Sequence, residues 1–196
     1  MLKYCLGLDV SSKELYACLS VIDHLQKVTV KSSSKFLNNS GGFDSLVAWL
    51  IKHHKQKDIA LVVVMEATGV YYENVALYLH LKGYQVSVVL PNKAKKYLQA
   101  TGQKSKNDRI DAQGLSRMGA EQSLDLWQPK DEYFYQLRSL TRQHQSLQEL
   151  KTNVNNQLHA DEHGMYQNEV VISQLRLLIA TIKGQIKDIE LSLIHI

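Results

Sequence analysis

The sequence predicts an α/β fold, with a mixed β-sheet flanked by helices, followed by a long α-helical coiled-coil hairpin. Three observations support this prediction. Apolar runs with strand-like alternation occupy the first 30 residues, helix-type and strand-type segments alternate over residues 43–90, and helical spacing continues without proline beyond Asp131. A chain of 196 residues, 44% of them apolar, suffices for one globular domain and an appendage.

Three strands are expected at the N-terminus. Residues 4–10 form an apolar run bounded by polar residues, as in a central strand. Residues 15–22 place apolar side chains at alternate positions, which indicates a second strand. Residues 25–30 alternate more weakly and predict a third, more exposed strand. Because the connections between them are short, these strands should form an antiparallel meander.

Helices and strands then alternate. Apolar residues recur at three- and four-residue spacing over residues 43–51, which predicts an amphipathic helix. Residues 59–65 are the most apolar stretch and indicate a parallel strand buried on both faces. Thr68 is expected to N-cap the next helix, which Gly83 should end.

A fifth strand is expected at residues 85–90, and Pro91 should open the next helix. The order is therefore β-β-β-α-β-α-β-α, which is the ribonuclease H-like (RuvC-like) arrangement. In that topology the fourth strand lies beside the first, and the helix after the fifth strand can cross both. Carboxylates on these three elements would then converge.

Four acidic residues occupy those places. Asp9 and Glu66 each end an apolar strand, whereas Asp108 and Asp111 are spaced to share one helix face. Each alone has an ordinary explanation, as a turn residue, a helix cap or an acid in the first helical turn. Together they predict a catalytic site with two Mg²⁺ ions, which prefer oxygen ligands and serve phosphodiester chemistry. Acids at the ends of core strands are costly unless a cation neutralises them.

A basic segment adjoins two of these acids. Between Pro91 and Arg117 the chain carries seven basic residues and only Asp108 and Asp111 as acids. The pattern favours DNA or RNA as the partner over a merely solvated basic surface. The candidate nucleic-acid-binding residues are Lys93, Lys95, Lys96, Lys104, Lys106, Arg109 and Arg117.

Composition also predicts the cellular compartment. Cys5 and Cys18 are expected to be buried thiols in a reducing cytosol, and the N-terminus lacks the apolar region of a signal peptide. No apolar run approaches the roughly 20 residues of a membrane span. We therefore expect a cytoplasmic protein without a membrane partner.

The C-terminal third predicts two long helices. Apolar residues from Ile172 to Ile196 alternate spacings of three and four, as in a coiled-coil seam. An intramolecular hairpin and a homo-oligomer explain this seam equally well. The expected domains are a catalytic domain at residues 1–125 and a helical hairpin at residues 126–196. Because the seam runs to the last residue, we expect a truncated chain, and the sequence leaves open whether residues 191–196 are native.

Three motifs resemble a known family. The segments Gly-Leu-Asp-Val-Ser at residues 7–11, Met-Glu-Ala-Thr-Gly-Val-Tyr at 65–71 and Lys-Asn-Asp-Arg-Ile-Asp-Ala at 106–112 resemble the DEDD transposases of the "insertion sequence one-ten" family, relatives of the Piv pilin-gene invertases. The resemblance covers about residues 1–160. It implies that Asp9, Glu66, Asp108 and Asp111 are the DEDD metal ligands of a Holliday-resolvase-like domain.

The same resemblance implies site-specific recombination of DNA with magnesium and a structured guide RNA. Family members also carry a C-terminal domain with a nucleophilic serine, to which no serine of this chain corresponds. Two alternatives to the recombinase remain open. One is a non-catalytic fragment that binds nucleic acid and oligomerises; the other is an actin-like phosphotransferase, for which residues 7–12 resemble the first phosphate loop.

Overall fold

The computed structural model describes residues 2–102 and 107–196. The chain divides into two compact units, Met1–Gln128 and Pro129–Ile196. The elements of the first unit are β1 (Lys3–Val10), β2 (Glu14–Ile22), β3 (Val28–Leu37), α1 (Ser40–His53), β4 (Leu61–Glu66), α2 (Glu73–Leu81), β5 (Gln85–Val89), α3 (Pro91–Ala100) and α4 (Asp108–Glu121). Those of the second are α5 (Glu132–Glu162) and α6 (Glu169–His195).

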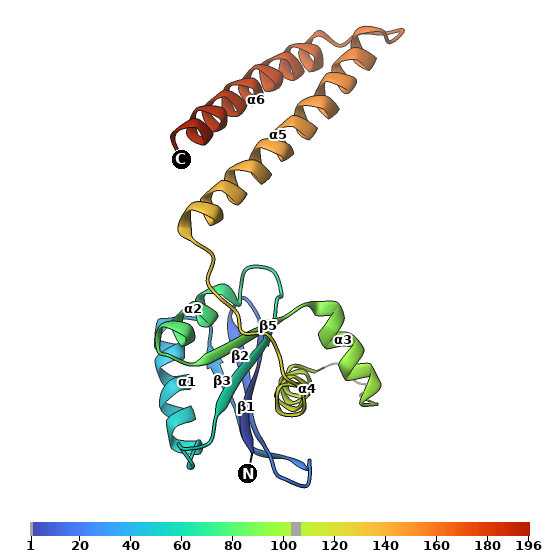
Figure 1. Ribbon diagram of the computed structural model, residues 1–196. Coiled ribbons are helices and arrows are strands. Elements are labelled where there is room, and N and C mark those ends of the chain that lie inside the picture. Colours follow the sequence, from blue (N-terminus) through green and yellow to red (C-terminus); the bar gives the residue numbers. More distant parts are fainter. Residues whose placement is uncertain (1, 103–106) are drawn as a thin grey trace. The chain divides into compact units, whose positions relative to one another are not determined.

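The described strands form one mixed sheet in the order β3-β2-β1-β4-β5 (Figure 1). The first three strands pair antiparallel, whereas β4 pairs parallel with both β1 and β5. This arrangement confirms the predicted ribonuclease H-like fold. The fourth strand lies beside the first, as the element order requires.

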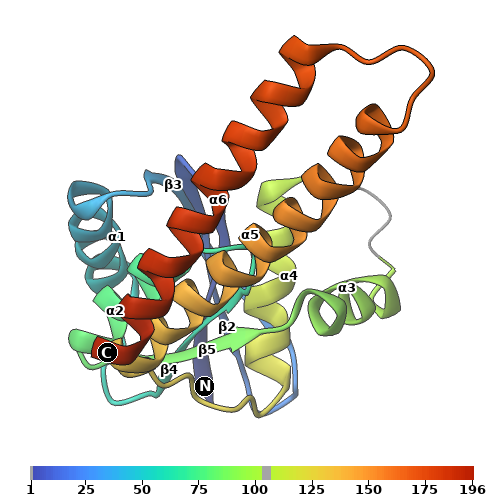
Figure 2. The same cartoon turned by 90° about the horizontal axis from the view of Figure 1, so that it is seen from above.

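Helices cover both faces of the sheet (Figures 1 and 2). Leu6 and Leu8 of β1 belong to the core that also includes buried residues of α1 and α2. Cys5 of β1 and Val64 of β4 belong to a second core that includes buried residues of α3 and α4. Because strand side chains alternate between faces, each central strand supplies both cores.

Close contact between α4 and the sheet depends on glycine. A Cβ atom on Gly7 of β1 would lie 2.1 Å from the backbone oxygen of Ala112 and 2.3 Å from the amide nitrogen of Ser116. A Cβ atom on Gly119 would lie 2.3 Å from Sγ of Cys5. These contacts set the position of α4 along β1.

Three local expectations were wrong. The third strand spans Val28–Leu37 and not residues 25–30, because this edge strand is polar on its open face and lacks a strong apolar pattern. Thr68 does not cap α2, which begins at Glu73; Gly69 at φ +59° turns the chain before the helix. After β5 there are two helices instead of one, and Gly102 at φ +77° follows the end of α3.

The second unit is a helical hairpin in which α5 and α6 lie side by side (Figures 1 and 2). The expected seam on α6 is buried from Ile172 to Ile186, and its residues from Leu175 to Ile186 form one core with Leu147 and Val154 of α5. Leu150 of α5 is 44% exposed and lies outside this core. Within the described residues, no helix combines the length and apolar character that a membrane span requires.

Candidate functional site at the ends of β1 and β4

Asp9 and Glu66 project from neighbouring strands on the face that α4 covers. Cys5 packs on that face and Gly7 touches α4, so strand alternation places the Asp9 side chain on the same side. Val64 belongs to the same core, which places Glu66 on that side as well. The parallel register pairs Leu8 with Met65, so Asp9 and Glu66 are the next residues of their strands.

The N-terminus of α4 approaches these two acids. Ala112 lies over Gly7 and Gly119 over Cys5, so α4 runs antiparallel to β1 and begins near Asp9. Asn107 caps this helix, because its Oδ1 accepts a hydrogen bond of 2.9 Å from the backbone N–H of Arg109. The capped first turn carries both Asp108 and Asp111.

Burial and the neighbouring negative charges both act on the carboxyl group of Asp9. The pKa of Asp9 is raised from 3.8 to about 6, mainly because burial disfavours its charged form. The negative charges of Asp108, Asp111 and Glu66 raise it further, in that order of effect, while a hydrogen bond from the backbone of Val10 lowers it. The fold thus brings Glu66, Asp108 and Asp111 within electrostatic range of Asp9.

The same acids do not close into a compact ligand cluster. Within residues 2–102 and 107–196, no three His, Cys, Asp or Glu side chains are grouped closely enough to hold a metal ion. Oε1 of Glu66 instead accepts a hydrogen bond of 3.2 Å from the hydroxyl of Thr68. Carboxylate oxygens are the ligand type that magnesium takes, but joint coordination would require their side chains to move closer together.

Sequence reasoning missed a row of side chains beside the acids. In the strand register Asp9 pairs with Tyr16, and Tyr16 pairs with Lys35 of β3. Nζ of Lys35 lies 2.6 Å from Oε2 of Glu14, and this hydrogen-bonded ion pair is the main cause of its raised pKa. The charge of Asp108 contributes to the same rise in pKa, so Lys35 lies within electrostatic range of Asp108. Only a correct assignment of β3 would have revealed this position.

The candidate nucleic-acid-binding residues lie on two helices. Lys93, Lys95 and Lys96 are exposed on α3, and Arg109 is exposed in the first turn of α4. Nε of Arg117 lies 2.7 Å from Oε1 of Glu121, so part of its charge is already balanced. Lys104 and Lys106 lie outside the described residues.

The topology and the strand-end acids define an α/β protein with a ribonuclease H-like fold. The family model of the IS110-type DEDD transposases, described as "Transposase", matches residues 6–161, and the chain belongs to this family. The "pilin gene-inverting proteins" of Moraxella lacunata and Moraxella bovis are each 33% identical to it over 143 residues. Those residues are 73% of this chain but 42% of each relative, so the chain spans less than half the length of these curated relatives.

Two solved structures are similar in fold. The Thermus thermophilus RuvC protein, solved "in complex with Holliday junction substrate", has a TM-score of 0.47 and 10% identity; the match covers 63% of this chain and 99% of that one. The fowlpox virus resolvase, solved with "substrate Holliday junction DNA", has a TM-score of 0.42 and 15% identity; the match covers 60% of this chain and 97% of that one.

Proposed function

We propose that this chain carries the metal-dependent, DNA-cleaving site of an insertion-sequence transposase, a site-specific recombinase. One observation supports the site above all: burial raises the pKa of Asp9, and Asp108, Asp111 and Glu66 lie near enough to raise it further. Clustered like charges are unfavourable unless a cation compensates them. Family membership supplies the reaction class.

The proposed roles follow from the position of each residue. Asp9 and Glu66 are held by paired strands and supply a rigid half of the acidic pocket. Asp108 and Asp111 come from a capped helix and supply the other half. We propose that the four carboxylates hold two Mg²⁺ ions. When bound, the ions supply Lewis-acid stabilisation of the attacking and leaving oxygens of a phosphodiester.

The proposed partners extend beyond this chain. They are the DNA of the element ends and target, and a structured guide RNA that directs strand transfer. The exposed basic residues of α3 and α4 suit polyanion contacts. We further propose a cytoplasmic homo-oligomer that associates through the helical hairpin, with residues 1–125 as the catalytic domain and residues 126–196 as the helical part.

The test is cleavage of a labelled four-way DNA junction with Mg²⁺, by the full-length protein that contains this chain. Asp9→Asn and Asp108→Asn should each lower the cleavage rate by at least about 100-fold, because each removes a charged oxygen ligand. Asp58→Asn, an exposed loop residue outside the site, is the matched control. Undiminished cleavage by both site variants would remove the proposal.

One observation favours a second candidate function. The described residues include no group of acids already arranged for a metal ion, which suits a fragment that binds nucleic acid and oligomerises without chemistry. Nicking of the junction by this chain alone with Mg²⁺ would exclude that reading. Junction binding without nicking, unchanged in Asp9→Asn, would favour it.

A further inference from the structure

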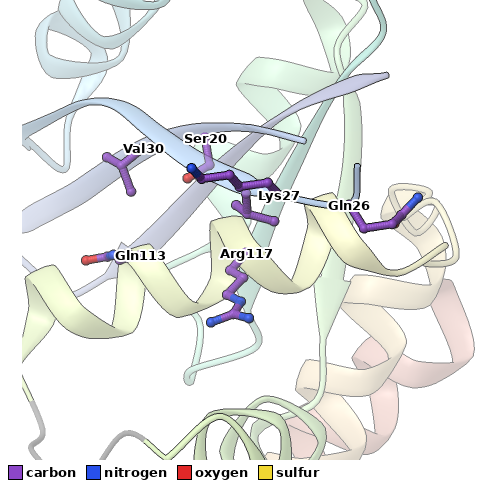
Figure 3. A pocket seen from close by; sticks show the side chains of 7 residues that line it. Ser20, Gln26, Lys27, Val30, Gln113 and Arg117 are labelled. Carbon is purple, nitrogen blue, oxygen red and sulfur yellow. The ribbon is translucent and has the colours of Figure 1, made fainter. Parts of the chain in front are cut away.

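A polar cavity lies between α4 and the turn that joins β2 to β3 (Figure 3). Its volume is about 300 Å³. Of the seven described residues that line it, two are cationic and none is a carboxylate. They are Ser20, Gln26, Lys27, Val28, Val30, Gln113 and Arg117.

The rim that carries Lys27 is held by a specific turn. The Asp23 carboxylate accepts hydrogen bonds from the backbone N–H groups of Leu25, at 2.9 Å, and of Lys27, at 3.0 Å. Between them Gln26 adopts φ +61°, the only non-glycine positive φ among the described residues. Such a conformation costs on the order of 1 kcal/mol and persists only where neighbouring contacts enforce it. The turn therefore fixes the backbone from which Lys27 extends.

The opposite wall belongs to α4. Gln113 and Arg117 lie one turn apart on this helix and are both exposed (Figure 3). Arg117 shares its charge with Glu121, whereas Lys27 makes no ion pair with the acids of the described segments. The hydrogen bond from the backbone N–H of Lys27 is the main cause of the lowered pKa of Asp23, and the side-chain charge of Lys27 adds a minor contribution. Of the two cations that line the cavity, Lys27 is therefore the one more available to an incoming anion.

This cavity lies on the same face as the acidic residues and farther along the same strands. At the cavity, Cys5 pairs with Ser20 and Ser20 with Val30; at the acids, the corresponding row is Asp9, Tyr16 and Lys35. Lys27 immediately precedes β3, whose first residue, Val28, pairs with Ile22, whereas Lys35 pairs with Tyr16. The six steps from Tyr16 to Ile22 span roughly 20 Å at about 3.3 Å per residue. A strand of B-form DNA advances about 3.4 Å per nucleotide, so the two ends of this span are about six nucleotides apart.

We propose that the face between β3 and α4 is a track for one DNA strand, and that the Lys27 cavity binds a backbone phosphate distant from the cleavage point. This inference rests on the proposed function, which places the scissile phosphodiester at the carboxylates. Lys27 supplies the charge for the phosphate, and the side-chain amide of Gln113 supplies a hydrogen-bond donor. A phosphate anchored there aligns the strand with Asp9 and Glu66.

The experiment measures the affinity of the 196-residue chain for a fluorescent four-way DNA junction without metal, over a range of salt concentrations. Lys27→Gln should weaken binding about 5-fold and lower the salt slope by about one, because one phosphate contact is lost. Gln113→Glu keeps the side-chain size but places a negative charge on the track, and should weaken binding by a similar factor. The matched controls are Lys52→Gln on α1 and Gln56→Glu in the loop after α1, both exposed and outside the cavity lining.

Each result decides the inference. Equal affinity and salt slope in Lys27→Gln, Gln113→Glu and the two controls would overturn it. Weakened binding of a structured RNA of equal length, with junction binding unchanged, would also overturn it and assign the cavity to RNA. The cleavage assay tests the proposed function separately. If Asp9→Asn abolishes cleavage and Lys27→Gln leaves junction binding unchanged, the recombinase proposal stands and the DNA track is rejected. If Lys27→Gln weakens junction binding and Asp9→Asn leaves cleavage unchanged, the DNA track stands and the cleavage site is rejected.

Discussion

Replacement of Asp9 by asparagine should stabilise the metal-free protein at high pH. The native pKa of Asp9, about 6, lies above its ordinary value of 3.8. The folded state therefore binds this proton more tightly than the unfolded state, so stability falls as pH rises through the window from 3.8 to about 6. Above that window the full penalty applies, and below it the penalty vanishes.

The loss of folding stability caused by the ionised Asp9 carboxylate can be estimated from its pKa. A pKa difference of this size corresponds to about 3 kcal/mol, and partial exposure of the carboxylate with solvent screening reduces it to about 1–2 kcal/mol. Asp9→Asn removes the charge while it keeps the shape. We expect it to raise the free energy of unfolding by about 1–2 kcal/mol at pH 8 and to change it little at pH 4.

Urea unfolding followed by tryptophan fluorescence reports on the correct unit, because Trp49 and Trp127 both lie within Met1–Gln128. Mg²⁺ at about ten times its dissociation constant should stabilise the unchanged protein by about 1.4 kcal/mol at pH 8, and Asp9→Asn much less. Asp58→Asn should show neither effect. Destabilisation by Asp9→Asn at pH 8, or the same gain at both pH values, would refute the raised pKa of Asp9 on which this prediction rests.

Two further substitutions test the packing. Gly7→Ala should destabilise the first unit by about 1–3 kcal/mol, because the new Cβ atom meets the backbone of α4 at 2.1 Å and displaces the acidic first turn. The control is Gly184→Ala in α6, which should cause no destabilisation because nothing lies within 4 Å of the new Cβ atom. Equal unfolding midpoints of the two variants in urea would show that α4 adapts freely. Ile182→Ala should cost the hairpin about 2–5 kcal/mol, since Ile182 is 1% exposed, whereas Leu177→Ala at 70% exposure should cost under about 0.5 kcal/mol. Thermal loss of the helical circular dichroism signal measures the effects of Ile182→Ala and Leu177→Ala. Similar effects of the two substitutions would contradict the buried seam of the hairpin.

Local patterns determined much of the fold. The apolar run before Asp9 and the run before Glu66 each specified a strand, because burial on both faces selects continuous apolar residues. Three- and four-residue spacing specified the hairpin helix from Ile172 onward, and Pro91 marked the start of α3. Element order then restricted the topology to a mixed sheet with β4 beside β1.

The edge of the sheet was less predictable. β3 pairs on one side only and carries serine and lysine at positions where a central strand would be apolar, so its length was not visible in the pattern. Lys35 was missed for that reason. The start of α2 was also misplaced, because a polar residue such as Thr68 can bond to Glu66 instead of capping a helix.

By itself, the sequence determined which acids end which elements, because strand and helix periods are local properties of the chain. Only the tertiary structure decided how near Asp108 and Asp111 come to Asp9, because that depends on the contact of Gly7 with Ala112 and Ser116, more than 100 positions later in the chain. It also decided that Lys35 joins the acidic row and that Lys27 faces α4 across a cavity. Contacts of that kind depend on strand register and helix placement, which no local pattern encodes.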